Sequence, residues 1–257
     1  MPEGHTLHRL AREQASLVGR QVRASSPQGR FAEGASWLDG RTVDDVDAYG
    51  KHLLHRFGDH HLHVHLGLRG FFLRHPSPLP EPRGQVRLRL AAPDEGWDLI
   101  APLRCEILDD GARGDLLGRL GPDPLRDDAD PDDAWRRLSR QRGAVGVALL
   151  DQAVIAGIGN VVRTEALAAC GIAPQRPSGE ISRVEFDCLW TCASSILERA
   201  TALGRIVTVD GPGSDDLPES EARYVYKQER CRRCGTPIET ADLAGRTAYW
   251  CPRDQPS

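Results

Sequence analysis

The sequence contains no long apolar run. No stretch approaches the ~20 apolar residues that a membrane-spanning helix requires, and the N-terminus lacks the apolar core of a signal peptide. Seven cysteines are scattered over 257 residues, unlike the dense disulfide framework of a small secreted protein. With 40% hydrophobic and 27% charged residues, we expect a cytoplasmic globular protein of one large or two modest domains.

Aromatic residues are also scarce. They form 5% of the chain, too few for a stripe of side chains that stacks along a nucleic acid strand. The net charge of −4 argues weakly against a nucleic acid partner, but it is a poor guide because the charges are segregated. An acidic run lies directly before a basic cluster: Asp127, Asp128, Asp130, Asp132 and Asp133, then Arg136, Arg137, Arg140 and Arg142.

Lysine is nearly absent and occurs only at Lys51 and Lys227. A high share of arginine can reflect genome composition alone. However, arginine stays protonated in proteins, whereas lysine can lose its proton. A lysine kept against this background is therefore a candidate for a special role.

The first half of the chain predicts a helix followed by a β-rich region. From Glu3 to about Val18 the apolar residues have helical spacing, and Gly19 is a fitting stop. Short alternating runs separated by Gly, Pro and Asp then predict an antiparallel sandwich or barrel. A stretch rich in proline and aspartate, residues 118–133, reads as a linker.

The second half is predicted to be helical. Asp130-Pro131 is a helix start, and residues 143–171 predict two helices around a glycine-rich turn. Ser182 with Glu185 is a capping-box pattern before a long helix. The predicted apolar face of that helix contains Val184, Phe186, Leu189, Ile196 and Leu197.

The predicted fold class is therefore α+β, in three parts. Residues 1–125 form an N-terminal β-sandwich domain with a leading helix. Residues 126–222 form a helical domain, and residues 223–257 form a short β-hairpin that carries cysteines.

Pro2 and Glu3 form an unusual pair. If Met1 is removed, Pro2 becomes a free secondary amine at the mouth of a helix. An α-amino group has a pKa of about 8, so more of it is an unprotonated nucleophile at neutral pH than of a lysine side chain. Its attack on an aldehyde carbon gives an iminium, an electron sink for elimination, and Glu3 could move protons beside it. The alternative is an ordinary N-terminus with a helix-favouring Pro-Glu pair.

The tail has the spacing of a zinc finger. Cys231-x-x-Cys234 is followed, after sixteen residues, by Cys251-Pro-Arg-Asp254. Thiolates are usual zinc ligands, and a carboxylate is a less usual one. We predict one structural zinc held by the three cysteines, with Asp254 or a water as the fourth ligand. A two-stranded finger would point its tip, with Arg246, away from the metal; without metal, Asp254 would pair with an arginine such as Arg232 or Arg233.

The segment AGIGN, residues 156–160, is a glycine-rich turn that enters a helix. Free backbone N–H groups and the helix dipole suit a phosphate at such a turn. Asn160 could be both the N-cap and a phosphate donor. The alternative is a tight turn between two helices.

Histidines and the remaining cysteines receive plainer interpretations. His61, His63 and His65 share one face of a strand and could hold a metal, but a strand exposing them to solvent or DNA is favoured. The four cysteines outside the tail are most simply core residues, with Cys188 and Cys192 one turn apart on the long helix.

Five segments resemble, in the same order, the formamidopyrimidine-DNA glycosylase / endonuclease VIII family of base-excision repair enzymes. MPEG is similar to its catalytic N-terminus, GKHLL to the strand with the catalytic lysine, and HLGLRG to its intercalation loop. DQAVIAGIGNVVRTEAL resembles the helix–two-turn–helix element, and CRRC…GRTAYWCPRD resembles the zinc finger. The opening MPEGHTLHRLA is similar to the actinobacterial endonuclease VIII-like branch.

The resemblance implies a bifunctional DNA glycosylase and AP lyase for oxidised bases. Pro2 would attack the anomeric carbon of the damaged nucleotide, and the iminium would permit β- and δ-elimination. Glu3 would be the general acid, and Lys51 would contact phosphate and aid catalysis. The implied partner is double-stranded DNA with a damaged base or an abasic site, bound by a monomer.

The same resemblance implies DNA contacts. Asn160 and Arg246 would clamp phosphates around the flipped nucleotide. Leu68, followed by Arg69 in the intercalation loop, would fill the gap left in the base stack. Such wedges and clamps offset the few kcal/mol that extrusion of a base costs.

The sequence departs from the family pattern at four places. Thr6 stands where many members have a second glutamate, Val162 where a tyrosine is common, and Asp254 where the fourth zinc cysteine is expected. The region near Leu103-Arg104, which usually supplies two more void-filling side chains, is not recognisable. These departures put the substrate range in doubt more than the chemistry.

Three alternatives stay open at this point. The same scaffold could be specialised for bulky or alkylated bases. It could be a DNA-damage-binding protein without catalysis, although the intact Pro2, Glu3 and Lys51 speak against this. A metal hydrolase built on His61, His63 and His65 would leave Pro2 unexplained.

Overall fold

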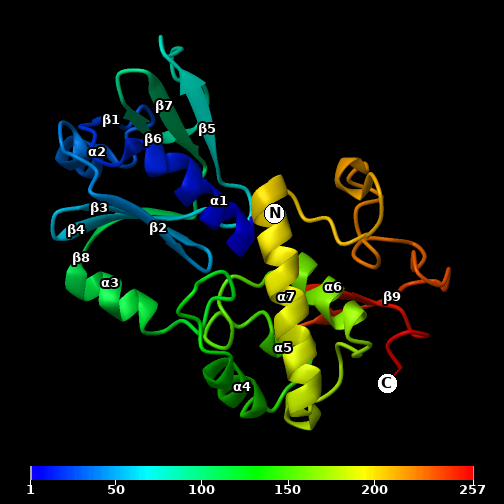
Figure 1. Ribbon diagram of the computed structural model, residues 1–257. Coiled ribbons are helices and arrows are strands. Elements are labelled where there is room, and N and C mark those ends of the chain that lie inside the picture. The colour runs from blue at the N-terminus through cyan, green and yellow to red at the C-terminus, as the bar shows by residue number, and fades with distance from the viewer. Residues whose placement is uncertain (1, 257) are drawn as a thin grey trace. The chain divides into compact units, whose positions relative to one another are not determined.

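The computed structural model describes residues 2–256 and divides into two compact units (Figure 1). Within residues 2–256, the first unit comprises Pro2 and residues 7–119, and the second comprises residues 3–6 and 120–256. Within residues 2–256, no helix combines the length and apolar composition needed to cross a bilayer. The expected removal of Met1 concerns a residue outside the described range.

The first unit is built on two four-stranded antiparallel sheets, ordered β1-β6-β7-β5 and β2-β3-β4-β8. Alternation along the strands places apolar side chains of both sheets in one core, so the predicted antiparallel sandwich is confirmed. The strands are β1 (Arg23–Ser25), β2 (Asp45–Tyr49), β3 (His52–Phe57), β4 (His60–His65), β5 (Phe71–Pro76), β6 (Val86–Ala91), β7 (Glu95–Ile100) and β8 (Arg104–Asp109). The helices are α1 (Gly4–Gln14), η1 (Ala15–Leu17), α2 (Ala32–Leu38) and α3 (Asp110–Leu117).

The first helix is shorter than predicted. It begins at Gly4, so Pro2 and Glu3 precede it, and it ends at Gln14, where the single 3₁₀ turn η1 follows. Gly19 has a φ of 76°, which suits glycine, but it lies beyond that turn. The backbone of Glu3 is therefore not part of the helix.

The second unit is helical and ends in a β-hairpin. Its core surrounds α6, because every residue from 160 to 168 is buried. The predicted helix before the glycine turn is only the single turn α5; the segment between α5 and α6 turns at Gly157, whose φ of 89° a helix does not accommodate. Its elements are α4 (Pro131–Ser139), α5 (Val145–Ala148), α6 (Asn160–Ala169), η2 (Ser178–Glu180), α7 (Arg183–Leu203), η3 (Ser214–Asp216), β9 (Glu239–Leu243) and β10 (Arg246–Trp250).

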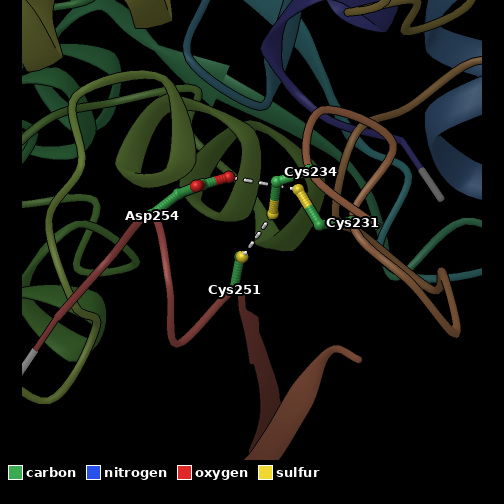
Figure 2. Close-up of side chains that lie close together, drawn as sticks. All are labelled: Cys231, Cys234, Cys251 and Asp254. Carbon is green, nitrogen blue, oxygen red and sulfur yellow. Dashed lines mark hydrogen bonds between the residues drawn. The ribbon is translucent and has the colours of Figure 1, made fainter. Parts of the chain in front are cut away.

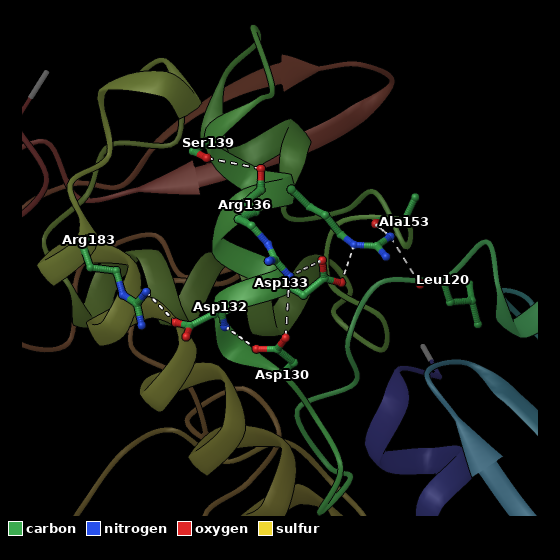
Figure 3. A network of polar contacts seen from close by, with 9 residues as sticks. Leu120, Asp130, Asp132, Asp133, Arg136, Ser139, Ala153 and Arg183 are labelled. Carbon is green, nitrogen blue, oxygen red and sulfur yellow. Dashed lines mark hydrogen bonds and ion pairs between the residues drawn. The ribbon is translucent and has the colours of Figure 1, made fainter.

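Part of the acidic run pairs with arginines around α4, some from the basic cluster and one, Arg183, from α7 (Figure 3). Asp130 caps the helix by accepting the N–H of Asp132 at 2.9 Å. Arg183 bonds to Asp132 at 2.6 Å, and Arg136 bonds to Asp133 at 3.1 Å. The opposite charges that are segregated in the sequence are therefore partly neutralised by each other in the fold. These ion pairs are partly exposed, so each contributes little to the stability of the protein.

The capping box at the start of α7 is confirmed, with Ser182 and Glu185 bonded reciprocally. Phe186, Leu189 and Leu197 are buried as predicted. Val184, however, is 79% exposed, so its predicted place on the apolar face is wrong. It lies two residues before Phe186, about 200° around the helix axis, and faces away from the core.

The expectation of four core thiols outside the tail is also wrong for two of them. Cys170, just after α6, forms a disulfide with Cys188 on α7. Cys105 and Cys192 are half-buried thiols. The packing of α6 against α7 brings together residues that are far apart in the sequence.

Candidate active site

The carboxylate of Glu3 is buried at the N-terminus of α6. Glu3 is 0% exposed and accepts backbone N–H groups of Gly159 at 3.0 Å, Val161 at 2.9 Å and Val162 at 3.2 Å. The first N–H groups of a helix have no intrahelical partner and form its positive end. This end of α6 therefore holds the carboxyl group in one position, directly after Pro2 in the chain.

Two glycines permit this close approach. The N–H of Gly4 donates to the carbonyl of Gly157 at 2.8 Å, and a Cβ on Gly4 would lie 2.9 Å from the Cα of Gly157. A Cβ on Gly159 would lie 2.3 Å from the Cδ of Glu3. The opening MPEG and the distant turn GIGN are thus two halves of one structure.

The prediction that Asn160 is the N-cap is wrong. The cap position belongs to Gly159, whose backbone is extended and which makes no side-chain cap; Glu3 performs the capping from another segment. Asn160 is the first helical residue, and its Nδ2 donates to the carbonyl of Thr247 at 3.0 Å. This bond places Asn160 next to the strand that begins with Arg246.

Arg163 supports the same contact and was not identified from the sequence. It is 1% exposed; its guanidinium bonds to the Oδ1 of Asn160 and donates to the carbonyls of Thr247 at 3.1 Å and Gly146 at 2.9 Å. Burial lowers the pKa of Arg163 to about 10, whereas the nearby Glu3 raises it. The sequence signal that could have identified Arg163 is a charged residue within a largely apolar helix, because arginines are rarely buried unless they are paired.

A second buried carboxylate on α6, that of Glu165, was also missed. It accepts the backbone N–H groups of Tyr224 and Val225 at 2.9 Å and of Tyr226 at 2.7 Å. The Oγ1 of Thr208 donates to it at 2.5 Å. Glu165 thereby ties the segment that leads into the C-terminal hairpin to α6.

The hairpin turns at Ala244 and Gly245, both with positive φ, of 54° and 74°, as in the tight turns that suit antiparallel strands. Arg246 pairs with Leu243 next to this turn and is exposed. Cys251 follows the other end of β10. The structure thus separates Arg246 from the cysteine cluster by the length of the strand.

Cys231, Cys234, Cys251 and Asp254 converge, with their donor atoms within 4.8 Å of one another (Figure 2). The Sγ atoms of Cys234 and Cys251 are 3.4 Å apart, and the Sγ of Cys231 is 3.3 Å from Asp254 Oδ2. Three sulfurs and one carboxylate oxygen form a donor set that fits structural zinc.

The pairing of Asp254 with Arg232 or Arg233, expected for a metal-free tail, is not what the structure has. Arg232 bonds to Glu221 at 3.2 Å. Arg233 donates to the carbonyl of Ala168 at 3.2 Å. The carboxylate of Asp254 is directed to the cysteine cluster instead (Figure 2).

In the first unit, Lys51 lies at the tip of the β2–β3 hairpin. Tyr49 pairs with His52, so Gly50 and Lys51 form a two-residue turn, which the φ of 57° at Gly50 permits. Lys51 is half-buried. The Nδ1 of His52 lies 2.8 Å from the Nε2 of His63, and burial lowers the pKa of His52 to about 3.

The expectation that β4 exposes three histidines is wrong. His61 and His63 are 4% and 1% exposed. They bond to Asp110 at 2.8 Å and Glu106 at 3.0 Å, because α3 and neighbouring side chains cover this face of the sheet. Within residues 2–256, the grouped metal donors found are two cysteine-based sets, which gives the histidine metal site no support.

Leu68 and Arg69 lie exposed in the loop between β4 and β5. Leu103, in the loop between β7 and β8, is 67% exposed. A Cβ on Gly67 would lie 2.8 Å from the Cβ of Leu103, so the two loops are neighbours. The region whose pattern was unrecognisable thus presents an apolar side chain close to Leu68.

Comparison with known proteins gives matches along almost the whole chain. Family models match in succession: the formamidopyrimidine-DNA glycosylase N-terminal domain at residues 1–100, its H2TH domain at residues 120–210, and the zinc finger found in FPG and IleRS at residues 228–256. A solved structure of wild-type Lactococcus lactis Fpg, bound to DNA that contains N7-benzyl-Fapy-dG, superimposes with a TM-score of 0.83. It is 24% identical, and the match covers 100% of both chains, which shows a shared fold.

Curated relatives are closer in sequence. "Endonuclease 8 1" of Mycobacterium tuberculosis is 48% identical over 265 residues, and the alignment covers 98% of each chain. "DNA-(apurinic or apyrimidinic site) lyase Nei2" of Mycolicibacterium smegmatis is 34% identical over 267 residues, also covering 98% of each. With its buried Glu3 after Pro2, its helical element and its cysteine finger, the chain belongs to the formamidopyrimidine-DNA glycosylase / endonuclease VIII family.

Proposed function

We propose that the protein is a base-excision repair DNA glycosylase with AP-lyase activity that removes oxidised bases. The observation that carries this proposal is the carboxylate of Glu3, buried on the N-terminus of α6 and adjacent in sequence to Pro2. A nucleophilic amine and a fixed proton-transfer group are what base excision through an iminium requires.

In the proposed mechanism, the amine of Pro2 attacks the anomeric carbon and the damaged base leaves with its bonding electrons. The secondary amine becomes an iminium, which draws electrons from the sugar and allows loss of the 3′ and then the 5′ phosphate. Glu3 transfers protons during ring opening and elimination. Its N–H donors from α6 fix the carboxylate and balance its charge.

The DNA contacts are also proposals. Asn160 and Arg246 lie on segments joined by the Asn160–Thr247 bond, which supports a shared phosphate site. Lys51 at its hairpin tip would bind another phosphate. Leu68, with Arg69 beside it, would occupy the space of the extruded nucleotide, and the exposed Leu103 adds apolar surface there.

Zinc, when bound, would hold the finger strands in register through Cys231, Cys234, Cys251 and Asp254. It would have no part in the reaction. We further propose that the enzyme acts as a monomer in the bacterial cytoplasm, on double-stranded DNA with a damaged base or an abasic site.

Borohydride trapping tests the nucleophile. On a duplex with an abasic site, the protein with Pro2 at its N-terminus should form a covalent adduct with DNA. The matched control carries one additional residue ahead of Pro2 and should form none, because the amine becomes an amide. Equal trapping by both proteins would exclude Pro2 and point to one of the two lysines.

The Asp254→Cys variant tests the fourth zinc ligand. A thiolate is a softer ligand than a carboxylate, so the variant should retain zinc at higher chelator concentration. Elemental analysis of the purified wild type should give one zinc per chain. Active wild-type protein free of zinc would show that the finger is a metal-free hairpin.

A further inference from the structure

Three cysteines of the second unit meet where α6 ends beside α7. Cys170 is the C-cap of α6, and Cys188 and Cys192 lie one turn apart on α7. The disulfide joins Cys170 to Cys188, and the Sγ of Cys192 lies 3.8 Å from the Sγ of Cys170. All three sulfurs lie within 4.8 Å of one another, and all three residues are half-buried rather than sealed in the core.

The third thiol distinguishes this cluster from a simple structural crosslink. A disulfide rearranges when a thiolate attacks one of its sulfurs, and Cys192 is placed for attack on Cys170. That step forms a Cys170–Cys192 bond and releases Cys188 as a thiolate, without net oxidation. We propose that Cys170, Cys188 and Cys192 form a thiol–disulfide exchange site for low-molecular-weight thiols and disulfides, with Cys170 as the shared partner.

Oxidation of the fully reduced site would use a small disulfide as the oxidant. One protein thiolate attacks it, forms a mixed disulfide and releases one small thiolate. A second protein thiolate then attacks the protein sulfur of that mixed disulfide, closes the internal bond and releases the second small thiolate. Two protein thiols are oxidised and one small disulfide is reduced to two thiols.

The cluster differs chemically from the zinc-finger set. In the finger, Cys234 and Cys251 are unbonded at 3.4 Å and share the site with a carboxylate. The α6–α7 cluster contains cysteines alone, and two of them are already joined. The first set is suited to a metal ion, and the second is suited to sulfur–sulfur exchange.

The exchange site also adjoins the finger. Arg233, between two zinc-ligand cysteines, donates to the carbonyl of Ala168 at 3.2 Å, two residues before Cys170. The side chain of Gln255 donates to the carbonyl of Ile172 at 2.7 Å, two residues after it. A change of partner at Cys170 therefore acts on the backbone segment against which the finger is docked.

The test uses the full-length zinc-loaded protein in oxidised and reduced glutathione at several ratios. Free thiols are blocked in acid with N-ethylmaleimide, and disulfides are mapped by mass spectrometry after chymotryptic cleavage, which can separate Cys188 from Cys192 at Trp190. Wild type should show both the Cys170–Cys188 and the Cys170–Cys192 bonds. Cys188→Ser should still form Cys170–Cys192, and Cys192→Ser should form Cys170–Cys188 only.

The control is Cys105→Ser, which removes a half-buried thiol from the first unit and should leave the wild-type mixture unchanged. If Cys188→Ser forms no Cys170–Cys192 disulfide at any of the glutathione ratios, the proposal is overturned. A second zinc held by the reduced wild type and lost in Cys192→Ser would overturn it in favour of a metal site. The proposal is independent of base excision, so Cys192→Ser should retain excision activity whichever result the mapping gives.

Discussion

The two units of this protein bury their carboxylates against different hydrogen-bond donors. The second unit buries carboxylates, Glu3 and Glu165, and each accepts three backbone N–H groups. In the first unit, the buried carboxylates of Glu95 and Asp98 pair with the guanidinium groups of Arg74 and Arg89. The first unit also buries an imidazole without an ionic partner: His55 is 0% exposed and its Nε2 lies 2.6 Å from Gln14 Oε1. Amide donors replace the water around a carboxylate, so its charge can persist, whereas burial lowers the pKa of His55 to about 4 and keeps it neutral.

Backbone N–H groups compensate the buried Glu3 and Glu165 of the second unit, whereas guanidinium groups compensate the buried Glu95 and Asp98 of the first. Within the second unit, Glu3 and Glu165 have nearly the same hydrogen bonds, so local geometry alone does not distinguish a catalytic carboxylate from a structural one; their neighbours do.

The largest effect is expected at Glu3. Glu3→Gln should reduce excision of an oxidised base from duplex DNA by roughly 10²- to 10⁴-fold, the range typical for loss of proton transfer. Cutting at a preformed abasic site should remain measurable. Both rates are measured with labelled oligonucleotides.

A substitution at Gly159, which lies against the Glu3 side chain, gives a matched comparison. Gly159→Ala should also reduce excision, because the new Cβ would meet the Glu3 carboxyl carbon. Gly143→Ala, in open space within the same unit, is the control. If Glu3→Gln stays folded but loses excision and abasic-site cutting equally, its role is structural, like that of Glu165.

Glu165→Gln should have its main effect on stability. The amide group would turn an N–H toward backbone donors and leave some of them unpaired, at about 1–3 kcal/mol for each buried group. We expect the free energy of unfolding, measured in urea, to fall by about 2–4 kcal/mol. We also expect the segment that leads into the C-terminal hairpin to be held less firmly on α6. Unchanged stability combined with lost excision would contradict the division of roles between the two carboxylates.

The smallest effect concerns pH and the first unit. An unfolded histidine titrates near 6.5, whereas His55 in the fold has a pKa of about 4, so the unfolded state binds more protons between these values. Its contribution to stability is fully present above pH 6.5 and is lost as the pH falls toward 4. Between pH 4 and 6.5 the free energy of unfolding should therefore depend on pH, and His55→Gln should reduce that slope by up to about 1.4 kcal/mol per pH unit. The free energy is measured by urea unfolding at several pH values. An identical slope in both proteins would show that His55 is not neutral in the fold.

Much of the architecture could be read from local patterns. Period-two alternation predicted the antiparallel strands, Asp130-Pro131 predicted the start of α4, and Ser182 with Glu185 predicted the cap of α7. These features depend on residues within a few positions of one another, so no knowledge of tertiary contacts is needed. The Cys231-x-x-Cys234 pair is informative for the same reason.

Other features depended on segments that meet only after folding. Asn160 looked like a helix cap, but Glu3 supplies that cap from more than 150 residues away. The histidines of β4 looked exposed, but covering side chains such as Asp110 bury them. Arg163 and Glu165 were not identified from the sequence, because their partners at Thr247 and Tyr224–Tyr226 come from the distant tail.

The sequence by itself determined the chemistry that is available: a proline amine, an adjacent carboxylate, a rare lysine and a finger-like cysteine set. Side-chain type and short spacing decide which bonds a group can make, and they are written in the order of residues. Only the tertiary structure decided which groups are buried against backbone donors, kept neutral or joined covalently. That decision depends on burial and on partners from distant segments, as Glu3 on the α6 amides and Cys170 beside Cys188 and Cys192 demonstrate.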